Sequence, residues 1–401
     1  MTLRAFKPAS SLRQAPPPRT AFWAVSFVIL AFSVALALLP PALVKIKPEM
    51  GLTTGQAGQL SGVLFAPFLV MVFAGNYASR FVPKGTIAAV GCAFLVAGCA
   101  AAGMCRDYSG LMAAAALLGM GSGLIEPTAP ALIGGLWEGR KRTAAMNYSQ
   151  VSFAAGSIGI PVGMAALIAA GGNWRAAFWA GAAVCSLSGL WMVASGTVHA
   201  GYEPPGKSER RAVLDGFALL LIAAMFAYVA AEVSVCYWLP SYFQQVLNAP
   251  DAMAAATNGV FWTGAIVGRL AAGYFSKTAG DVWLLRFSAV AGTLIMLLFW
   301  TLDTPATGMA ATALIGLAFA CIWPTILSYA GHVYGARLGQ VFPWIIAAGA
   351  FGAAAGPVIG GGAAARFGQH AGFLVNPIFF ALISLIVIAA PGREKWARPG
   401  A

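Results

Sequence analysis

Residues 119–136 read GMGSGLIEPTAPALIGGL, an apolar run that carries a single carboxylate, Glu126. An ionised carboxylate at membrane depth is costly, and it is therefore a candidate functional group. Pro127 and Pro130 follow directly, and because proline lacks a backbone N–H, we expect them to break the helix at this point. Irregular backbone at membrane depth is tolerated where protein surrounds it or where it lines a cavity. The stretch therefore predicts a carboxylate that faces a protein-lined cavity.

The composition of the whole chain is that of a membrane protein. Of its 401 residues, 60% are hydrophobic and 9% are charged, whereas a soluble domain usually carries about 25% charged residues. The length accommodates about twelve helices of ~20 residues with short connections. We predict an all-α membrane protein, embedded in the lipid bilayer, with twelve transmembrane helices. Their expected ranges are 21–44, 57–79, 85–104, 110–136, 143–170, 176–197, 214–246, 256–276, 283–302, 307–331, 340–364 and 371–390.

The longest polar stretch inside the chain divides these helices into two sets of six. It begins at His199 and reads HAGYEPPGKSERRAVLD. We therefore predict two six-helix bundles that are joined by a linker and flanked by short tails. The expected divisions are a cytoplasmic N-terminal tail (1–20), an N-terminal bundle (21–197), a cytoplasmic linker (198–215), a C-terminal bundle (216–390) and a cytoplasmic C-terminal tail (391–401).

The basic residues indicate the orientation of the chain. The formal net charge is +12, but Lys and Arg are scattered between apolar runs and form no cluster of the kind that binds nucleic acid. If the N-terminus is cytoplasmic, 18 Lys and Arg residues fall on the cytoplasmic side and 5 on the other. Because cytoplasmic loops carry the excess of positive charge, we predict an even number of spans, with both termini on the cytoplasmic side of a bacterial inner membrane.

Several classes of function lack the residues that they need. The six cysteines and three histidines show no metal-ligand spacing, and no Gly-x-x-x-x-Gly-Lys-Ser/Thr phosphate loop is present. A membrane enzyme would need paired His, Asp or Cys residues at the membrane surface, which the loops do not offer. The first apolar run is too long for a cleaved signal peptide. We therefore expect a monomer without metal, cofactor, nucleic-acid partner or enzymatic activity.

An internal repeat relates the two sets of helices. The opening stretch recurs 197 residues later, with Trp323 in the place of Glu126, and a second Gly-Pro segment recurs at 196 residues. The matched residues are Gly119 with Gly316, Pro127 with Pro324, Thr128 with Thr325, Gly156 with Gly352 and Pro161 with Pro357. Parallel repeats of this kind are related by an axis along the membrane normal and place a binding site near the midplane, between the halves.

With these features the chain resembles the major facilitator superfamily along its whole length. The loop between the second and third helices of that family has the form Gly-x-x-x-Asp-Arg-x-Gly-x-Lys/Arg. Here it reads GNYASRFVPK over residues 75–84, with Ser79 in place of the acid and Val82 in place of the second glycine. The segment around Pro161 resembles the family's fifth-helix motif, which is often associated with antiporters. The resemblance implies conformational roles for Gly75, Arg80, Lys84, Gly156, Pro161, Gly356 and Pro357.

The opening stretch resembles a narrower group, the fucose permease group of sugar–proton symporters. There a Gly-x-Gly-x-x-Glu-x-x-Ala segment of the fourth helix carries the proton-coupling glutamate, and Glu126 stands at that position. Pro130 replaces the usual asparagine, and residues 32–39 hold Ser33 but no counterpart of the group's first-helix aspartate. Residues 228–242 resemble the seventh helix of the same group. The resemblance implies a coupling role for Glu126 without a two-carboxylate scheme of that kind.

The candidate site residues follow from chemistry at membrane depth. Glu126 and Glu232 are the two acids placed deep in expected helices, and because burial favours a neutral carboxyl group, we predict that they couple transport to protons. The alternative is an acid that only joins helices. Aromatic faces with nearby amides and hydroxyls suit a sugar, a nucleoside or an aromatic organic acid, although Trp and Tyr also line membrane interfaces. The expected substrate contacts are Tyr228, Trp238, Tyr242, Trp323, Asn147, Tyr148, Gln150 and Asn376.

One basic residue, Arg269, lies inside an expected helix. It could bind an anionic substrate, but we expect it to reach the membrane interface or to pair with Asp281. Taken together, these features predict a secondary active transporter that moves a small organic solute, sugar-like or an organic acid, by proton-coupled alternating access. The alternative is a proton-driven exporter of amphipathic or aromatic compounds, which the Gly-Pro helices and the few polar residues at mid-depth favour.

Overall fold

The computed structural model describes residues 17–137, 139–201, 214–279, 281–334 and 338–389. Within these ranges the side chains of residues 139–144, 147, 273–282, 332, 338–340 and 389 are not described. Most of both expected tails and of the expected linker lies outside the described residues, so their boundaries remain predictions. The helices of the first half are α1 (Pro18–Met50), α2 (Thr54–Ala78), α3 (Lys84–Met104), α4 (Tyr108–Leu136), α5 (Gly139–Ala169) and α6 (Arg175–Ala194), followed by the short η1 (Thr197–His199).

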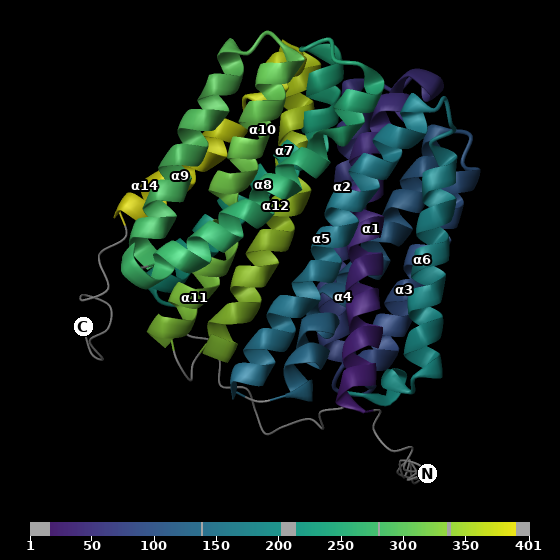
Figure 1. The fold of residues 1–401 in the computed structure, drawn as a ribbon, viewed down its shortest axis with the longest axis vertical. Helices are drawn as coiled ribbons and strands as arrows, with labels where there is room; N and C mark the ends of the chain where they lie inside the picture. The colour runs from purple at the N-terminus through teal and green to yellow at the C-terminus, as the bar shows by residue number, and fades with distance from the viewer. Residues whose placement is uncertain (1–16, 138, 202–213, 280, 335–337, 390–401) are drawn as a thin grey trace, which may run out of the picture.

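The second half has the same plan with two of its spans divided. Its helices are α7 (Gly216–Gln245), α8 (Asp251–Ala279), α9 (Asp281–Leu298) with η2 (Phe299–Thr301), α10 (Pro305–Phe319), α11 (Ile322–Tyr334), α12 (Leu338–Phe367), α13 (Gln369–Phe373) and α14 (Asn376–Ala389). Counting α10 with α11 and α13 with α14, eleven described helical segments are long and apolar enough to cross a membrane. α8 is the remaining long helix, and the described residues form no strand, so the predicted all-α fold is confirmed (Figure 1).

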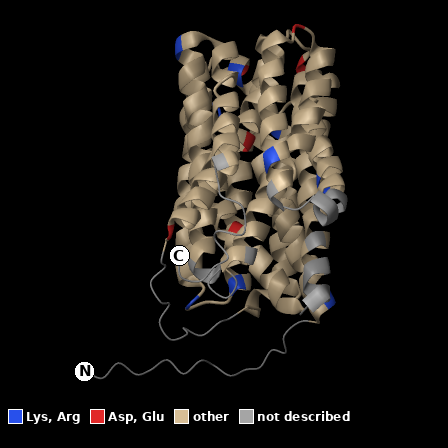
Figure 2. Ribbon diagram, turned by 90° about the vertical axis from the view of Figure 1, so that its left-hand side faces the viewer, with Lys and Arg blue, Asp and Glu red and all other residues tan. Residues whose placement is uncertain are grey.

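Side chains fix where several helices begin. Thr53 and Gln56 form a reciprocal capping box at the start of α2. The carboxylates of Asp107 and Asp215 each accept a hydrogen bond of 2.8 Å from a backbone N–H in the first turn of α4 and α7. Charged residues are otherwise sparse along the helices and lie mostly toward their ends (Figure 2).

The prolines after Glu126 do not break their helix, which corrects the sequence-based prediction. α4 continues without interruption through Pro127 and Pro130. The hydroxyl of Thr128 donates to the carbonyl of Leu124, 2.7 Å away, and such Ser and Thr contacts, together with packed neighbouring helices, let membrane helices tolerate proline. The break occurs instead in the repeated segment, between α10 and α11, shortly before Pro324.

The sequence repeat is also a repeat of packing. A methyl group at Gly119 would overlap the backbone carbonyl of Leu64 on α2, and a methyl group at Gly316 would overlap that of Phe261 on α8. Leu64 and Phe261 are themselves 197 residues apart. The same close crossing of a glycine over a carbonyl therefore occurs once in each half.

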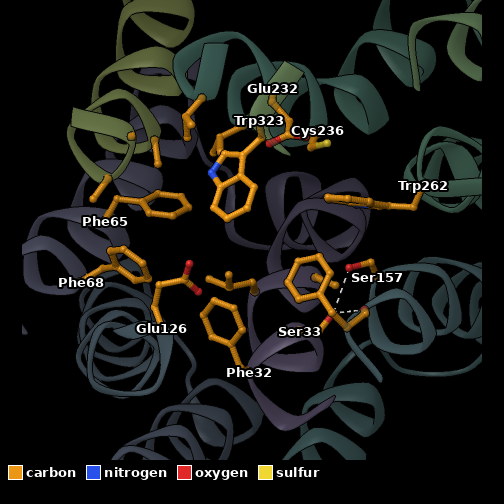
Figure 3. A pocket seen from close by; sticks show the side chains of 18 of the residues that line it. Phe32, Ser33, Phe65, Phe68, Glu126, Ser157, Glu232, Cys236, Trp262 and Trp323 are labelled. Carbon is orange, nitrogen blue, oxygen red and sulfur yellow. Dashed lines mark hydrogen bonds between the residues drawn. The ribbon is translucent and has the colours of Figure 1, made fainter. Parts of the chain in front are cut away.

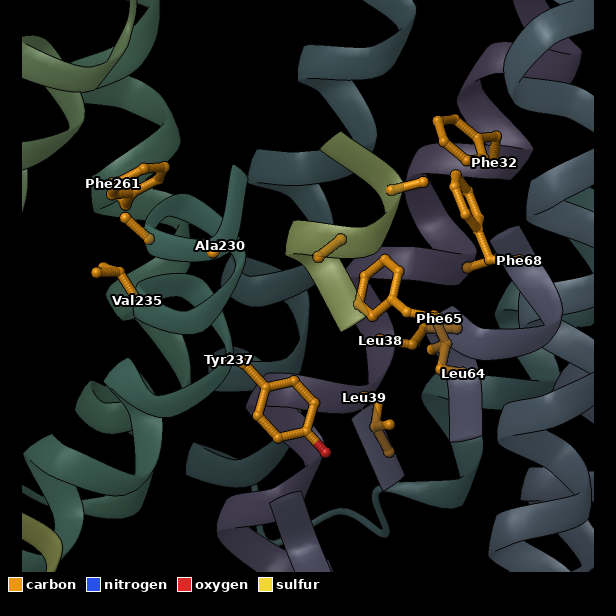
Figure 4. Packing of buried hydrophobic residues seen from close by; sticks show 14 of the residues in the cluster. Phe32, Leu38, Leu39, Leu64, Phe65, Phe68, Ala230, Val235, Tyr237 and Phe261 are labelled. Carbon is orange, nitrogen blue, oxygen red and sulfur yellow. The ribbon is translucent and has the colours of Figure 1, made fainter. Parts of the chain in front are cut away.

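The two halves meet through matched contacts as well. A Cβ at Gly62 of α2 would lie 3.0 Å from the side chain of Val358 on α12, and a Cβ at Gly259 of α8 would lie 3.0 Å from that of Val162 on α5. The pairs α2–α12 and α5–α8 are thus equivalent under the repeat, as expected for pseudo-symmetric bundles. Buried side chains of both halves form one apolar core, in which the Tyr237 ring points toward the side where Leu39 lies (Figure 4).

Candidate functional site

A cavity of about 330 Å³ lies between the two halves. Its wall is formed by α1, α2, α4 and α5 from the first half and by α7, α8, α11 and α12 from the second. The first half contributes mostly aromatic and aliphatic side chains, among them Phe32, Phe65, Phe68 and Phe153. The second half contributes most of the polar ones. The cavity therefore presents two chemically different sides to a ligand.

Glu126 projects into this cavity from α4, close to Phe68 (Figure 3). Its side chain is half-buried and makes no hydrogen bond or ion pair with any other residue that the structure describes. An acid that only joined helices would be bonded to a neighbouring helix. The geometry therefore leaves the Glu126 carboxyl group available to a proton, water or ligand.

Glu232 lies on the opposite side of the same cavity (Figure 3). It accepts a hydrogen bond of 2.5 Å from the hydroxyl of Tyr228, one turn earlier on α7, as the spacing of four residues allows. The structure thus brings the two predicted acids into one cavity, but only Glu232 has a partner within its own helix.

The predicted substrate contacts fall into two groups. Tyr228, Gln150 and Trp323 line the cavity together with the two acids. Trp323 is 37% exposed and points into the cavity from α11 (Figure 3). Tyr148 is 69% exposed on α5 and is not among the lining residues, and the side chain of Asn147 lies outside the description.

The remaining predicted contacts lie on helices of the second half, outside the cavity wall. Trp238 is buried, and its Nε1 donates to the carbonyl of Pro357, 2.9 Å away. The Tyr242 hydroxyl donates to the carbonyl of Phe299 at 3.0 Å. Asn376 is buried at the start of α14 and donates to the carbonyl of Phe373 at 2.8 Å. Their bonds are those of residues that hold helices together.

The motif residues implied by the family resemblance lie in two places. Gly75 is buried near the end of α2, the guanidinium of Arg80 lies 5.8 Å from the centroid of the Tyr77 ring, and Lys84 begins α3. Gly156, Pro161, Gly356 and Pro357 lie instead at helix crossings: Gly156 packs against α1, Gly356 against α7, and Pro161 lines the cavity.

Three lining residues on α8 escaped the sequence analysis or were interpreted differently there. Asn258, Trp262 and Arg269 all line the cavity, and their spacing of four and then seven residues places them on one helical face. Arg269 was expected at the interface or paired with Asp281, whose side chain is not described; the structure places it in the cavity wall instead. The helical spacing was the signal that could have found this face.

The cavity is closed at the end of the molecule where α1 ends. Lys45 of α1 forms a 2.7 Å ion pair with Asp251 of α8, which also accepts a 2.8 Å hydrogen bond from Gln244. Gln244 donates to the carbonyl of Val44 as well, at 3.2 Å, and the Tyr237 hydroxyl donates across the halves to the carbonyl of Ala57, at 2.5 Å. These contacts join the two halves at this end.

The lining residues extend away from that closed end. Pro40, Tyr237 and Asn258 lie nearest to it, whereas Pro130 and Arg269 lie toward the end where α1 begins. Among the described residues no group of three or more His, Cys, Asp and Glu side chains gathers as a metal site would require.

Comparisons with known proteins give the same architecture. The family model described as Major Facilitator Superfamily matches residues 22–342. Protein TsgA of Escherichia coli is 24% identical over 375 residues, which cover 90% of this chain and 92% of that protein. The glucose/mannose transporter GlcP of Bacillus subtilis is 23% identical over 318 residues, 74% of each chain. A glucose/galactose transporter of Brucella abortus is 32% identical over 187 residues, 45% of each chain.

Solved structures share the fold at low sequence identity. A POT family transporter in complex with 5-aminolevulinic acid superposes with a TM-score of 0.78 at 14% identity, covering 92% of this chain and 95% of that one. A bacterial homolog of the human lysosomal transporter Spinster, in an inward-facing and occupied conformation, superposes with a TM-score of 0.73 at 12% identity, covering 94% and 97%. At these identities the likeness concerns the fold alone.

Proposed function

The chain belongs to the major facilitator superfamily, and from this membership we propose that it is a secondary active transporter of a small organic solute, sugar-like or an organic acid, driven by protons. The observation that carries the proposal is a cavity between two pseudo-symmetric halves, closed at one end, with the unpartnered carboxyl group of Glu126 in its wall. The named sugar transporters among its relatives support a solute of sugar size.

The proposed cycle is alternating access by rocking of the two halves. The ion pair of Lys45 with Asp251 and the Tyr237 hydroxyl hold one end shut, and the matched crossings α2–α12 and α5–α8 provide a seam about which rigid bundles turn. If both termini are cytoplasmic, this arrangement is the inward-facing state. Opening the other end requires those contacts to separate while the opposite ends of the same helices close.

Glu126 is the proposed proton carrier, and Glu232 the second acid of the site. Glu126 has no hydrogen-bond or ion-pair partner among the described residues, so its carboxyl group is open to take up a proton and to release it when the cavity opens to water of higher pH. Glu232 already accepts the Tyr228 hydroxyl, which fixes its position for contact with substrate. Tyr228, Gln150 and Trp323 complete the proposed substrate contacts within the cavity.

A second candidate, a proton-driven exporter of amphipathic or aromatic compounds, is favoured by one observation. Phe32, Phe65, Phe68 and Phe153 line the first half's side of the cavity, and they offer a purely apolar surface. Such a surface binds a hydrophobic ring without selecting for hydroxyl groups. The two candidates differ in direction of transport and in the polarity of the solute.

The test is transport by the purified protein in proteoliposomes with a panel of labelled sugars, organic acids and aromatic cations. Under an inward proton gradient, the proposal expects accumulation of a sugar or an acid that collapses when a protonophore is added. Under an outward proton gradient, accumulation of an aromatic compound by exchange for protons would support the exporter instead. Solute movement that does not respond to a proton gradient would refute both.

We further propose a bacterial inner-membrane location, both termini in the cytoplasm and a monomer. The support is the distribution of 18 Lys and Arg residues on one side and 5 on the other. Reporter fusions after Ser208 and after Ala249 should report opposite faces of the membrane, and fusions that report the same face would contradict this orientation. Light scattering of the detergent-solubilised protein would reveal a dimer if the monomer proposal is wrong.

A further inference from the structure

One cation lies in the wall of the cavity, within electrostatic range of the Glu232 carboxyl group but not ion-paired with it. Arg269 is half-buried on α8 and lines the cavity. Its Nε donates to the carbonyl of Ala320 at 3.5 Å, a long contact, and its guanidinium lies 5.8 Å from the centroid of the Trp262 ring. No ion pair in the described part of the chain includes Arg269. A charge at membrane depth is costly unless it is paired and usually marks the path of a substrate or ion.

The face of α8 that carries Arg269 also places two other side chains in the cavity wall, Asn258 and Trp262. Asn258 is 4% exposed, and its Nδ2 donates to the carbonyl of Cys236 at 2.8 Å. Its Oδ1 is buried and has no hydrogen-bond partner among the described residues. Trp262 lies between Asn258 and Arg269 on the same face. The three side chains thus present a hydrogen-bond acceptor, a flat ring and a cation in order along one wall of the cavity.

The opposite half supplies the second surface for a ring. Phe153 of α5 meets Trp262 edge to face, with ring centroids 5.5 Å apart and an interplanar angle of 76°. The ring centroid of Phe32 on α1 lies 6.0 Å from that of Phe153. Trp262 enters the cavity on the side away from Phe65 and Phe68 (Figure 3). A ring held at this point touches aromatic groups of both halves and lies within reach of the guanidinium.

Arg269 also lies at the depth of the proposed proton carrier. Glu126, Arg269 and Trp323 each stand 18 residues after the first residue of α4, α8 and α10, and these helices all start at the closed end of the molecule. At 1.5 Å per residue, Glu126 and Arg269 fall in one layer, because α4 and α8 run unbroken to these residues, whereas the break between α10 and α11 precedes Trp323.

We propose, on the basis of the proposed transport function, that the substrate is an organic anion: a solute with a carboxylate on a six-membered ring. Arg269 binds the carboxylate, and Trp262 and Phe153 hold the ring. Glu232 stays bonded to Tyr228. Transport of the anion with one proton carried by Glu126 is then electrically neutral.

The inference is tested by ligand-dependent thermal stabilisation of the purified full-length protein in detergent. Two matched pairs of probes differ only in a carboxylate: galacturonate with galactose, and 4-hydroxybenzoate with 4-hydroxybenzyl alcohol. We expect the carboxylate of at least one pair to bind about tenfold or more tightly than its neutral counterpart, the scale set by charge-assisted hydrogen bonds. Arg269→Gln should remove this preference, and Arg269→Lys should restore part of it. Arg366→Gln, at an exposed arginine of α12, is the control that should retain it.

Two results overturn the inference. The first is that neither carboxylate binds more tightly than its neutral counterpart, and the second is that Arg269→Gln retains the preference. Galactose binding without galacturonate binding would leave the proposed sugar transport standing while the anion site fails. Failure of the transport assay with every solute, in contrast, would remove the proposed function itself.

Discussion

Replacing Glu126 with glutamine should convert an accumulating transporter into an exchanger. Glutamine reproduces the size and the hydrogen-bonding groups of the neutral acid, but it cannot release a proton. The half-buried side chain lacks a partner among the described residues, so the substitution breaks no bond that the structure shows. We therefore expect Glu126→Gln to fold, to bind solute and to exchange internal for external solute at a rate similar to the wild type.

The size of the expected loss follows from the number of free acids in the cavity. Two carboxyl groups line it, and Glu232 is bonded to Tyr228, which leaves one group to carry one proton per cycle. One pH unit supplies about 1.4 kcal/mol per proton, a factor of ten in concentration. The wild type should thus accumulate its solute about tenfold per pH unit, and Glu126→Gln should reach about the external concentration.

The assay uses proteoliposomes with a gradient of about one pH unit, a membrane potential clamped with potassium and valinomycin, and the labelled solute that the panel identifies. Glu232→Gln should raise the apparent KM and keep the accumulation ratio. Asp303→Asn changes an exposed acid outside the cavity and should behave as the wild type. Tenfold accumulation by Glu126→Gln would refute the reasoning, because Glu126 would then be a structural acid and Glu232 the next candidate.

Three further sets of substitutions test the packing, the closed end and the aromatic residues. Gly119→Ala and Gly316→Ala each press a methyl group against a backbone carbonyl, so each should lower the unfolding free energy by about 1–3 kcal/mol in thermal denaturation. Gly135→Ala, where a Cβ would have nothing within 4 Å, should leave the unfolding free energy unchanged. Equal melting temperatures of the three variants would contradict the close approach of Gly119 and Gly316 to those carbonyls. Lys45→Met should destabilise the contacts at the closed end by about 0.2–1 kcal/mol. An impermeant thiol reagent added from the closed side should then label Cys236 faster. An unchanged labelling rate would show that the ion pair does not hold that end closed. Trp323→Ala should raise the apparent KM, whereas Trp238→Ala, which empties a buried site, should cost about 3–5 kcal/mol of stability. A KM change in Trp238→Ala alone would reverse these roles.

The backbone was largely predictable because membrane burial leaves few options. In lipid, every backbone group must be bonded within its own helix, so twelve apolar runs predict twelve helices with ends uncertain by a few residues. The repeat added which helices are equivalent. The prediction failed at Pro127 and Pro130, where α4 continues, because proline's missing donor is a local property and the compensating contact, from Thr128 to Leu124, depends on the side-chain conformation.

The candidate site was predictable where the type of a residue alone indicates that it lines a cavity. An acid deep in an apolar helix predicts a cavity, because contact of a carboxylate with lipid is energetically costly. Glu126 and Glu232 do line a cavity. Aromatic residues carry no such signal, since Trp and Tyr serve equally in packing and in binding. Trp238 and Tyr242 were expected at the site, yet each donates to a backbone carbonyl within the second half. Only the packing of neighbouring helices separates these two roles.

The repeat predicts equivalent backbone positions but not equivalent chemistry. Glu126 and Trp323 are matched in sequence and both line the cavity, yet one is an acid and the other a ring. Most of the other polar lining residues, Tyr228, Glu232, Asn258 and Arg269 among them, belong to α7 and α8 of the second half. A pseudo-symmetric scaffold can rock about its axis whatever lines the cavity, because the crossings at Gly62 and Gly259 each place a glycine against a valine side chain, Val358 or Val162, that is not among the ligand contacts named above. Ligand contacts are free to diverge between the halves for the same reason, and that divergence is what the sequence repeat cannot reveal.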